Sequence, residues 1–273
     1  MMWLVSGKMV GRQDEMDRLS DFVSPLWQDR SPGVLVIWGE PGVGKSRLMH
    51  EFQISQLFAQ HESMWALCQT SEIFRQPLNP FRYWLRRYLE QSERQPEARN
   101  KRNFNRKLDV LIAKTEATHA ALADELDRAR SFLGALVDLH WPDSLYELVD
   151  PQGRYENTLI ALIALLQADS LRQPVVLLLE DSQWLDEDTC AFLPRLNRVM
   201  SCDEYQCFPL AVIMTARRED SDTLLSVGLN YQEIILTGIS DADLASLADG
   251  ILEGILRVQT TRKIPFLYFQ AGQ

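Results

Sequence analysis

Five short apolar runs along the chain have the length and composition of buried strands. They are rich in branched and aliphatic side chains, and turn-forming or polar residues border them, which is typical of strands inside a sheet. The runs occupy residues 34–38, 63–68, 175–179, 210–214 and 232–236.

Between these runs, apolar residues recur at three- and four-residue steps and predict amphipathic helices. Strands that alternate with helices imply a parallel sheet covered on both faces, a three-layer α/β/α sandwich. A helical insertion is expected between the second and third strands, at about 79–170. A polar stretch at 91–105 is expected to be a loop, and 141–153 a connector. Helices are expected at 9–27, 46–58, 77–89, 119–139, 155–168 and 241–256.

A glycine-rich segment follows the first expected strand and satisfies the pattern G-x-x-x-x-G-K-[ST] in full. Glycines let the loop bring its amide groups close to phosphate oxygens, and the start of the next helix adds partial positive charge. Lys45 is expected to bind the β- and γ-phosphates of a nucleotide, and the Ser46 hydroxyl to bind Mg²⁺. The expected binding segment is Gly39, Glu40, Pro41, Gly42, Val43, Gly44, Lys45, Ser46 and the following Arg47.

Two adjacent carboxylates, Glu180 and Asp181, end the apolar run at 175–179. Beside a phosphate loop, one carboxylate can hold the Mg²⁺ shell while the other orients or deprotonates an attacking water. Taken alone, the pair also fits the solvated acids that end many strands. The run at 210–214 leads into Thr215 and Arg217, and either side chain can contact a γ-phosphate from a neighbouring strand. A surface arginine would give the same pattern at Arg217.

The charge balance bears on the kind of partner. The formal net charge of −10 disfavours a general binder of nucleic-acid backbones. Residues 82–107 are a local exception, with nine basic and three acidic side chains. A solvated helical face accounts for such a run, and a docking surface for an acidic partner is the alternative. The four cysteines lack the spacing of a metal site, so free thiols are expected.

Hydropathy gives an expectation about location. No apolar run approaches the roughly 20 residues that a membrane-spanning helix needs. Residues 1–10 have a lysine only after their short apolar stretch and no small-residue cleavage site, unlike a signal peptide. A cytoplasmic location without a membrane partner is therefore expected.

Four segments, taken in order, resemble motifs of the STAND-type ATPases, a branch of the AAA+-like P-loop proteins that act as regulatory modules of bacterial signalling proteins. The opening V-G-R-x-x-E-h segment of that family, where h is a hydrophobic residue, is similar to residues 10–16, and its phosphate loop to residues 39–46. Its acidic strand end, D/E-D-x-x-W-x-D, resembles residues 180–186. Its T-x-R strand tip resembles residues 215–217.

The resemblance implies a five-stranded parallel sheet of order 5-1-4-3-2, with ATP and Mg²⁺ at the carboxyl ends of the strands. It also implies slow ATP hydrolysis that switches the protein between nucleotide states in signal transduction. On this basis Glu180 takes the metal position, Asp181 orients the attacking water, and Arg217 senses the γ-phosphate. The family's opening segment packs near the adenine, and here it comprises Val10, Gly11 and Arg12.

The chain departs from the family pattern in two places. Glu180 stands where many relatives carry Asp, and its extra methylene moves the carboxylate, which bears on hydrolysis more than on binding. Relatives continue past a G-N-P turn into a winged-helix domain, whereas here Lys263 and Ile264 precede Pro265. Residues 1–240 are therefore expected to form the ATPase domain. Residues 241–273 are expected to be the truncated start of a helical lid or winged-helix region.

Partners follow from the resemblance rather than from single residues. It implies a partner protein or output domain supplied elsewhere, and ATP-dependent self-association. A nucleotide-binding scaffold without hydrolysis is an alternative, because of the order of Glu180 and Asp181 and the incomplete C-terminal part. A nucleic-acid-dependent ATPase is a further alternative, which the acidic charge balance disfavours.

Overall fold

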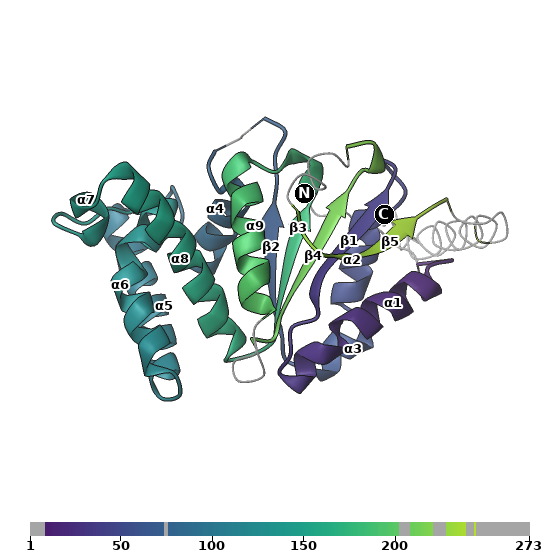
Figure 1. The fold of residues 1–273 in the computed structure, drawn as a ribbon, viewed down its shortest axis with the longest axis horizontal. Helices are drawn as coiled ribbons and strands as arrows, with labels where there is room; N and C mark the ends of the chain where they lie inside the picture. Colours follow the sequence, from purple (N-terminus) through teal and green to yellow (C-terminus); the bar gives the residue numbers. More distant parts are fainter. Residues whose placement is uncertain (1–8, 74–75, 202–207, 221–227, 239–242, 244–273) are drawn as a thin grey trace, which may run out of the picture.

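A parallel sheet forms the centre of the computed structural model, which describes residues 9–73, 76–201, 208–220, 228–238 and 243. The sheet has five strands in the order β2-β3-β4-β1-β5 (Figure 1). All four neighbouring pairs are parallel. Read from its other edge, this is the predicted order 5-1-4-3-2, so the predicted fold is confirmed.

Each strand overlaps the apolar run that predicted it. Parallel pairing brings the carboxyl ends of β1, β3 and β4 to one edge of the sheet, since Leu179 pairs with Met214 and Trp38 with Ala216. The strands are β1 (Gly33–Gly39), β2 (Met64–Gln69), β3 (Val175–Glu180), β4 (Leu210–Ala216) and β5 (Gln232–Leu236).

The side chains of successive strand residues pack alternately in two hydrophobic clusters, one on each face of the sheet. In β1, Leu35 and Ile37 belong to one cluster, whereas Val36 and Trp38 belong to the other. Helix α9 (Glu187–Met200) packs in the cluster of Val36 and Trp38. The cluster of Leu35 and Ile37 is covered by α1 (Gln13–Val23), the 3₁₀ turn η1 (Ser24–Gln28), α2 (Lys45–Gln53) and α3 (Gln56–Gln60) (Figure 1).

A helical insertion lies between β2 and β3, as the sequence predicts. Its apolar residues share one cluster with the sheet, so the insertion and the sheet have a common core. Helix α6 contacts both α5 and α8 and lies to one side of the sheet (Figure 1). The helices are α4 (Asn79–Tyr88), α5 (Glu97–Glu116), α6 (Ala120–Leu136), α7 (Leu145–Leu148) and α8 (Pro151–Ser170).

The prediction of a loop at 91–105 is wrong over most of its length, because α5 begins at Glu97. The first turns of α5 are rich in charge, and Phe104 is the first residue of this helix to be fully buried. Packing against the rest of the insertion stabilises these turns, and that packing joins residues far apart in the sequence.

Other boundaries differ because proline, glycine and serine have specific positions at helix ends. Residues 141–153 are not a simple connector: they contain α7, and α8 begins at Pro151, a favourable first helical position. Asp150 caps α8 by accepting a hydrogen bond from the N–H of Gly153 at 2.7 Å. The single helix predicted at 46–58 is two, since Ser55 is extended between α2 and α3.

Some predictions concern residues outside the described part of the chain. They include the helix at 241–256, apart from Asp243, and the lid or winged-helix start at 241–273. Cys202 and Cys207 also fall outside it, whereas Cys68 and Cys190 are free thiols as expected.

Candidate functional site

The phosphate loop joins the end of β1 to the start of α2 at the carboxyl edge of the sheet. Two of its glycines have backbone angles that other residues rarely adopt: φ is 81° at Gly42 and 102° at Gly44. Gly44 is also the residue immediately before α2, so the loop delivers the chain directly into the helix N-terminus. That end carries unpaired N–H groups and partial positive charge, which suit a phosphate.

The side chain of Lys45 folds back onto this loop. Its ammonium donates hydrogen bonds to the carbonyl oxygens of Gly39 at 2.6 Å and Glu40 at 3.1 Å. Burial lowers the pKa of the Lys45 ammonium; the negative charge of Asp181 opposes that shift, and the positive charge of Arg217 adds to it. A cation is therefore held inside the loop by neutral carbonyls, which a phosphate oxygen can replace as a stronger, charge-assisted acceptor.

Ser46 and Glu180 meet across the gap between α2 and β3. The Ser46 hydroxyl forms a side-chain hydrogen bond with the Glu180 carboxylate. Burial raises the pKa of Glu180, the charge of Asp181 raises it further, and the hydrogen bond from Ser46 opposes both effects. A hydroxyl and a carboxylate are oxygen ligands of the kind that Mg²⁺ takes beside phosphate. These two residues therefore fit Mg²⁺.

Magnesium bound with a nucleotide needs few protein ligands, because it keeps several waters and takes oxygens from the phosphates. In the described part of the chain there is no group of three or more His, Cys, Asp or Glu residues that could hold a metal ion. A fully protein-built metal centre is therefore not seen there, whereas the Ser46–Glu180 pair suits a shared site.

Asp181 takes a left-handed backbone conformation, with φ at 53°, directly after β3. Its N–H donates a hydrogen bond to Oγ1 of Thr215 in β4 at 3.1 Å. From the other side, Oγ1 of Thr70 lies 2.9 Å from the carbonyl oxygen of Glu180 and 2.7 Å from that of Asp181. Thr70, just after β2, and Thr215, in β4, thus fix the backbone of the acidic pair from the two strands that flank β3. Thr70 was missed by the sequence reading, although it lies just past the second predicted strand.

Arg217 follows β4 and lies beside the tryptophan of the acidic segment. Its guanidinium carbon is 6.0 Å from the centroid of the Trp184 ring, which is a cation–π distance. Arg217 is also close enough to Lys45 for its charge to lower the pKa of that ammonium. The structure therefore brings the strand-tip arginine to the same edge as Lys45 and Asp181.

The opening segment is tied to the phosphate loop through Arg12, whose side chain is 8 % exposed. Its guanidinium donates to the carbonyl oxygens of Val43 at 3.2 Å and Thr237 at 2.6 Å, and pairs with Glu15 at 2.8 Å. Gly11 precedes it with φ at 68°, and a Cβ at that position would lie 2.5 Å from the carboxyl carbon of Asp243. The segment thus packs against the loop.

The remaining residues of the two expected binding segments are exposed or half-buried. Glu40 and Pro41 are exposed, and Val43 is half-buried beneath the contact with Arg12. Arg47 pairs with Glu51 one turn along α2 at 2.6 Å. Val10 is half-buried at the start of the described chain.

A family model describing the AAA ATPase domain matches residues 8–208, which is more than half of the chain. The chain belongs to this family. Its five-stranded parallel sheet with helices on both sides is consistent with a nucleotide-binding AAA domain. No curated protein matches the chain significantly.

Asp186 closes the acidic segment of the AAA domain and anchors the helical insertion to it. The residue is 9 % exposed, and its carboxylate accepts four hydrogen bonds from three residues. Two come from the backbone N–H groups of Leu78 at 2.9 Å and Asn79 at 3.1 Å, at the start of α4. The others come from the N–H and hydroxyl of Thr189 in α9. The sequence pattern contained Asp186 but gave it no role.

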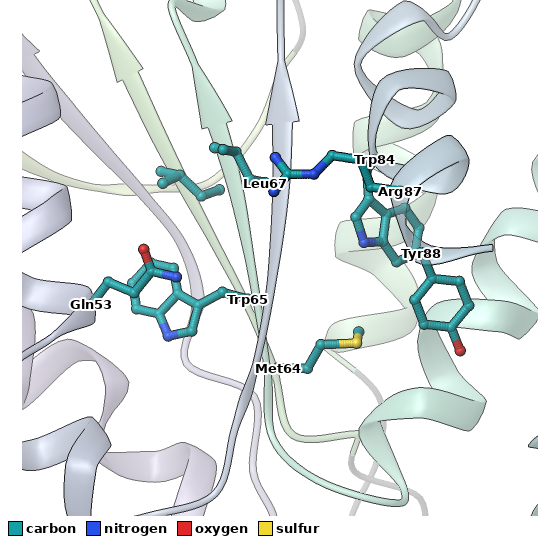
Figure 2. Close-up of a pocket in the computed structure, with 8 residues that line it drawn as sticks. Gln53, Met64, Trp65, Leu67, Trp84, Arg87 and Tyr88 are labelled. Carbon is teal, nitrogen blue, oxygen red and sulfur yellow. The ribbon is translucent and has the colours of Figure 1, made fainter. Parts of the chain in front are cut away.

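The AAA domain also has a cavity of about 420 Å³. It lies apart from the carboxyl edge of the sheet that carries the phosphate loop, called the nucleotide edge below. It wraps around β2, which in the described chain pairs with β3 alone and is an edge strand (Figure 2). None of its lining residues belongs to the phosphate loop or the acidic segment. They are Gln53, Met64, Trp65, Leu67, Trp84, Arg87, Tyr88 and Leu178.

Among the described residues of the AAA domain, no helix combines the length and hydropathy needed to cross a membrane.

Proposed function

We propose that this AAA domain binds ATP with Mg²⁺ and hydrolyses it slowly, as a STAND-type switch whose nucleotide state is passed to a partner protein or output domain. The observation that carries the proposal is the gathering of Lys45, Ser46, Glu180 and Asp181 at the carboxyl edge of the sheet. The Lys45 ammonium bonds the Gly39 carbonyl within the loop, and the Ser46 hydroxyl links the loop to Glu180. The preference for ATP over other nucleoside triphosphates is inferred from the family.

Each residue has one task in this proposal. Lys45 and the N-terminus of α2 bind the phosphates, since both present positive charge to the loop. Ser46 and Glu180 hold Mg²⁺, which when bound neutralises charge on the β- and γ-phosphate oxygens. Asp181 accepts a hydrogen bond from the attacking water and aligns it with the γ-phosphorus. Arg217 contacts the γ-phosphate and so distinguishes ATP from ADP.

The segment 10–12 is proposed to border the adenine. Arg12 donates to the loop carbonyl of Val43 and to that of Thr237, just after β5, so its contribution is to hold the segment in place rather than to read the base. The regulatory role, the slow rate and self-association with ATP come from the resemblance to STAND-type ATPases. They extend the family assignment and need their own test.

The test is calorimetric titration of MgATP into the full chain, with phosphate release followed in the same samples. Binding together with slow release, and loss of release alone in Asp181→Asn, is the expected result. Binding without release would replace the switch ATPase by a nucleotide-holding scaffold. Release that depends on added DNA would favour a nucleic-acid-dependent ATPase. Absence of binding would overturn the proposal.

A further inference from the structure

Trp184 is placed unlike the other tryptophans in the described part of the chain. The others pack in one of the two hydrophobic clusters and stabilise the fold through burial: Trp27, Trp38, Trp65, Trp84 and Trp141. Trp184 belongs to neither cluster and is half-exposed, at the end of the 3₁₀ turn η2 (Ser182–Trp184). Its contact with Arg217 lies at the nucleotide edge. Core packing therefore does not account for a large aromatic ring at this position.

The topology explains why these two residues meet. They follow β3 and β4, which are adjacent and parallel, so both segments leave the sheet at the same edge. Arg217 is half-buried, and no ion pair joins it to a carboxylate within the described residues. The ring of Trp184 is thus the contact that the structure gives for its guanidinium, at 6.0 Å.

We propose that Trp184 is a positioning residue that holds Arg217 stacked in the ligand-free and ADP-bound protein and releases it to the γ-phosphate of ATP. This inference rests on the proposed function, because it takes Arg217 as the γ-phosphate contact. A cation–π contact at a partly exposed site is weaker than a charge-assisted hydrogen bond to phosphate. The Arg217 guanidinium therefore binds the γ-phosphate when ATP is bound, and it returns to the Trp184 ring when ADP remains.

The stack sets how strongly the domain prefers ATP. ATP must break the contact between Arg217 and Trp184, whereas ADP leaves it intact. Removing the ring therefore favours the binding of ATP and does not affect that of ADP. Trp184→Leu is expected to tighten binding of an ATP analogue with a non-hydrolysable β,γ-imido bridge by about two- to fivefold. Its affinity for MgADP stays unchanged. In an Arg217→Ala background the same substitution has no effect, because the guanidinium is already gone.

The experiment measures dissociation constants for both nucleotides with Mg²⁺ by calorimetry. The proteins are the wild type, Trp184→Leu, Arg217→Ala and the double variant. The control is Trp141→Phe, since Trp141 also carries a cation, the Lys101 ammonium at 5.3 Å, but lies in the insertion. It should leave the ratio of the two constants unchanged. A melting curve for each variant establishes that it is folded.

Fluorescence supplies a second readout. The chain has seven tryptophans, so the signal of Trp184 is the difference between the wild type and Trp184→Phe. That difference should change when the ATP analogue binds and stay constant with ADP. A merely structural tryptophan would give no such nucleotide-specific change.

The outcomes separate this inference from the function on which it rests. Weaker binding of both nucleotides in Trp184→Leu, or an unchanged ratio while Arg217→Ala weakens only the ATP analogue, would overturn the positioning role and leave the proposed function standing. The same effect of Trp184→Leu in the Arg217→Ala background would overturn it too. Equal affinities of Arg217→Ala and the wild type for the analogue would remove Arg217 as the sensor. No binding to the wild type would overturn both proposals.

Discussion

The carboxylate of Asp186 accepts a hydrogen bond from the backbone N–H of Leu78 at 2.9 Å, across a sequence separation of 108 residues. Leu78 has φ at 56°, an uncommon angle for leucine, at the point where the chain enters α4. Asp186 therefore fixes an otherwise unfavourable turn and couples the helical insertion to the acidic strand end.

Removal of this carboxylate should destabilise the whole domain. Asp186→Ala leaves the buried N–H groups of Leu78 and Thr189 without their acceptor, and each such group costs about 1–3 kcal/mol. We expect the free energy of unfolding in urea to fall by roughly 3 kcal/mol. The matched control is Glu187→Ala, because Glu187 is the exposed next residue. Equal stabilities for the two variants would show that Asp186 is not an anchor.

Two substitutions of Asp181 distinguish its chemical role from the backbone conformation that it adopts. Asn tolerates the left-handed angle of 53°, so Asp181→Asn should keep the fold and bind MgATP with unchanged affinity. Its rate of phosphate release should fall about 100-fold or more, since the carboxylate no longer orients water. Asp181→Ala should lose the same activity and roughly 1 kcal/mol of stability as well. Full turnover in Asp181→Asn would assign that role to another group.

Arg12 is expected to support the phosphate loop mechanically. Arg12→Met removes its hydrogen bonds to Val43 and Thr237, and bonds from a charged donor are worth about 1.5–3 kcal/mol each. Stability should therefore drop even without nucleotide. Arg18→Met is the matched control, because exposed Arg18 likewise donates to a backbone carbonyl near the end of the chain, that of Glu233 in β5. A variant of Arg12 that unfolds like the wild type and loses only ATP affinity would point to direct contact with the base.

Removal of Mg²⁺ should expose the role of Ser46. Chelation with EDTA should weaken ATP binding by the wild type by roughly tenfold or more, on the scale of a lost metal contact. Ser46→Ala should show little difference between Mg²⁺ and EDTA, whereas Ser46→Thr retains a hydroxyl and should behave like the wild type. If Ser46→Ala responds to Mg²⁺ as strongly as the wild type, the ion is held by other groups.

The strands and the phosphate loop could be predicted because their determinants are local. A run such as 175–179 is apolar throughout, and the loop needs glycine at set positions such as Gly44. The error at 91–105 has the opposite cause. The charged start of α5 has a weak pattern of its own, and burial of Phe104 depends on helices elsewhere in the insertion.

Part of the site could not be predicted because it depends on contacts between distant residues. Thr70 meets the acidic pair only because β2 lies beside β3. Arg217 reaches Trp184 only because β3 and β4 are neighbours. The sequence showed that Trp184 and Asp186 belong to one motif, while the structure gives them different surroundings: one borders the nucleotide edge, and the other anchors α4.

The most direct test of the account is calorimetric titration of MgATP into the wild type and into Lys45→Ala. Lys45→Met keeps the buried stem without the charge and guards against a packing effect, and Lys114→Ala changes an exposed lysine as the control. We predict saturable binding to the wild type and Lys114→Ala, and its loss in both Lys45 variants while they remain folded. Equal binding by all four proteins, or none by the wild type, would contradict the proposed ATP site.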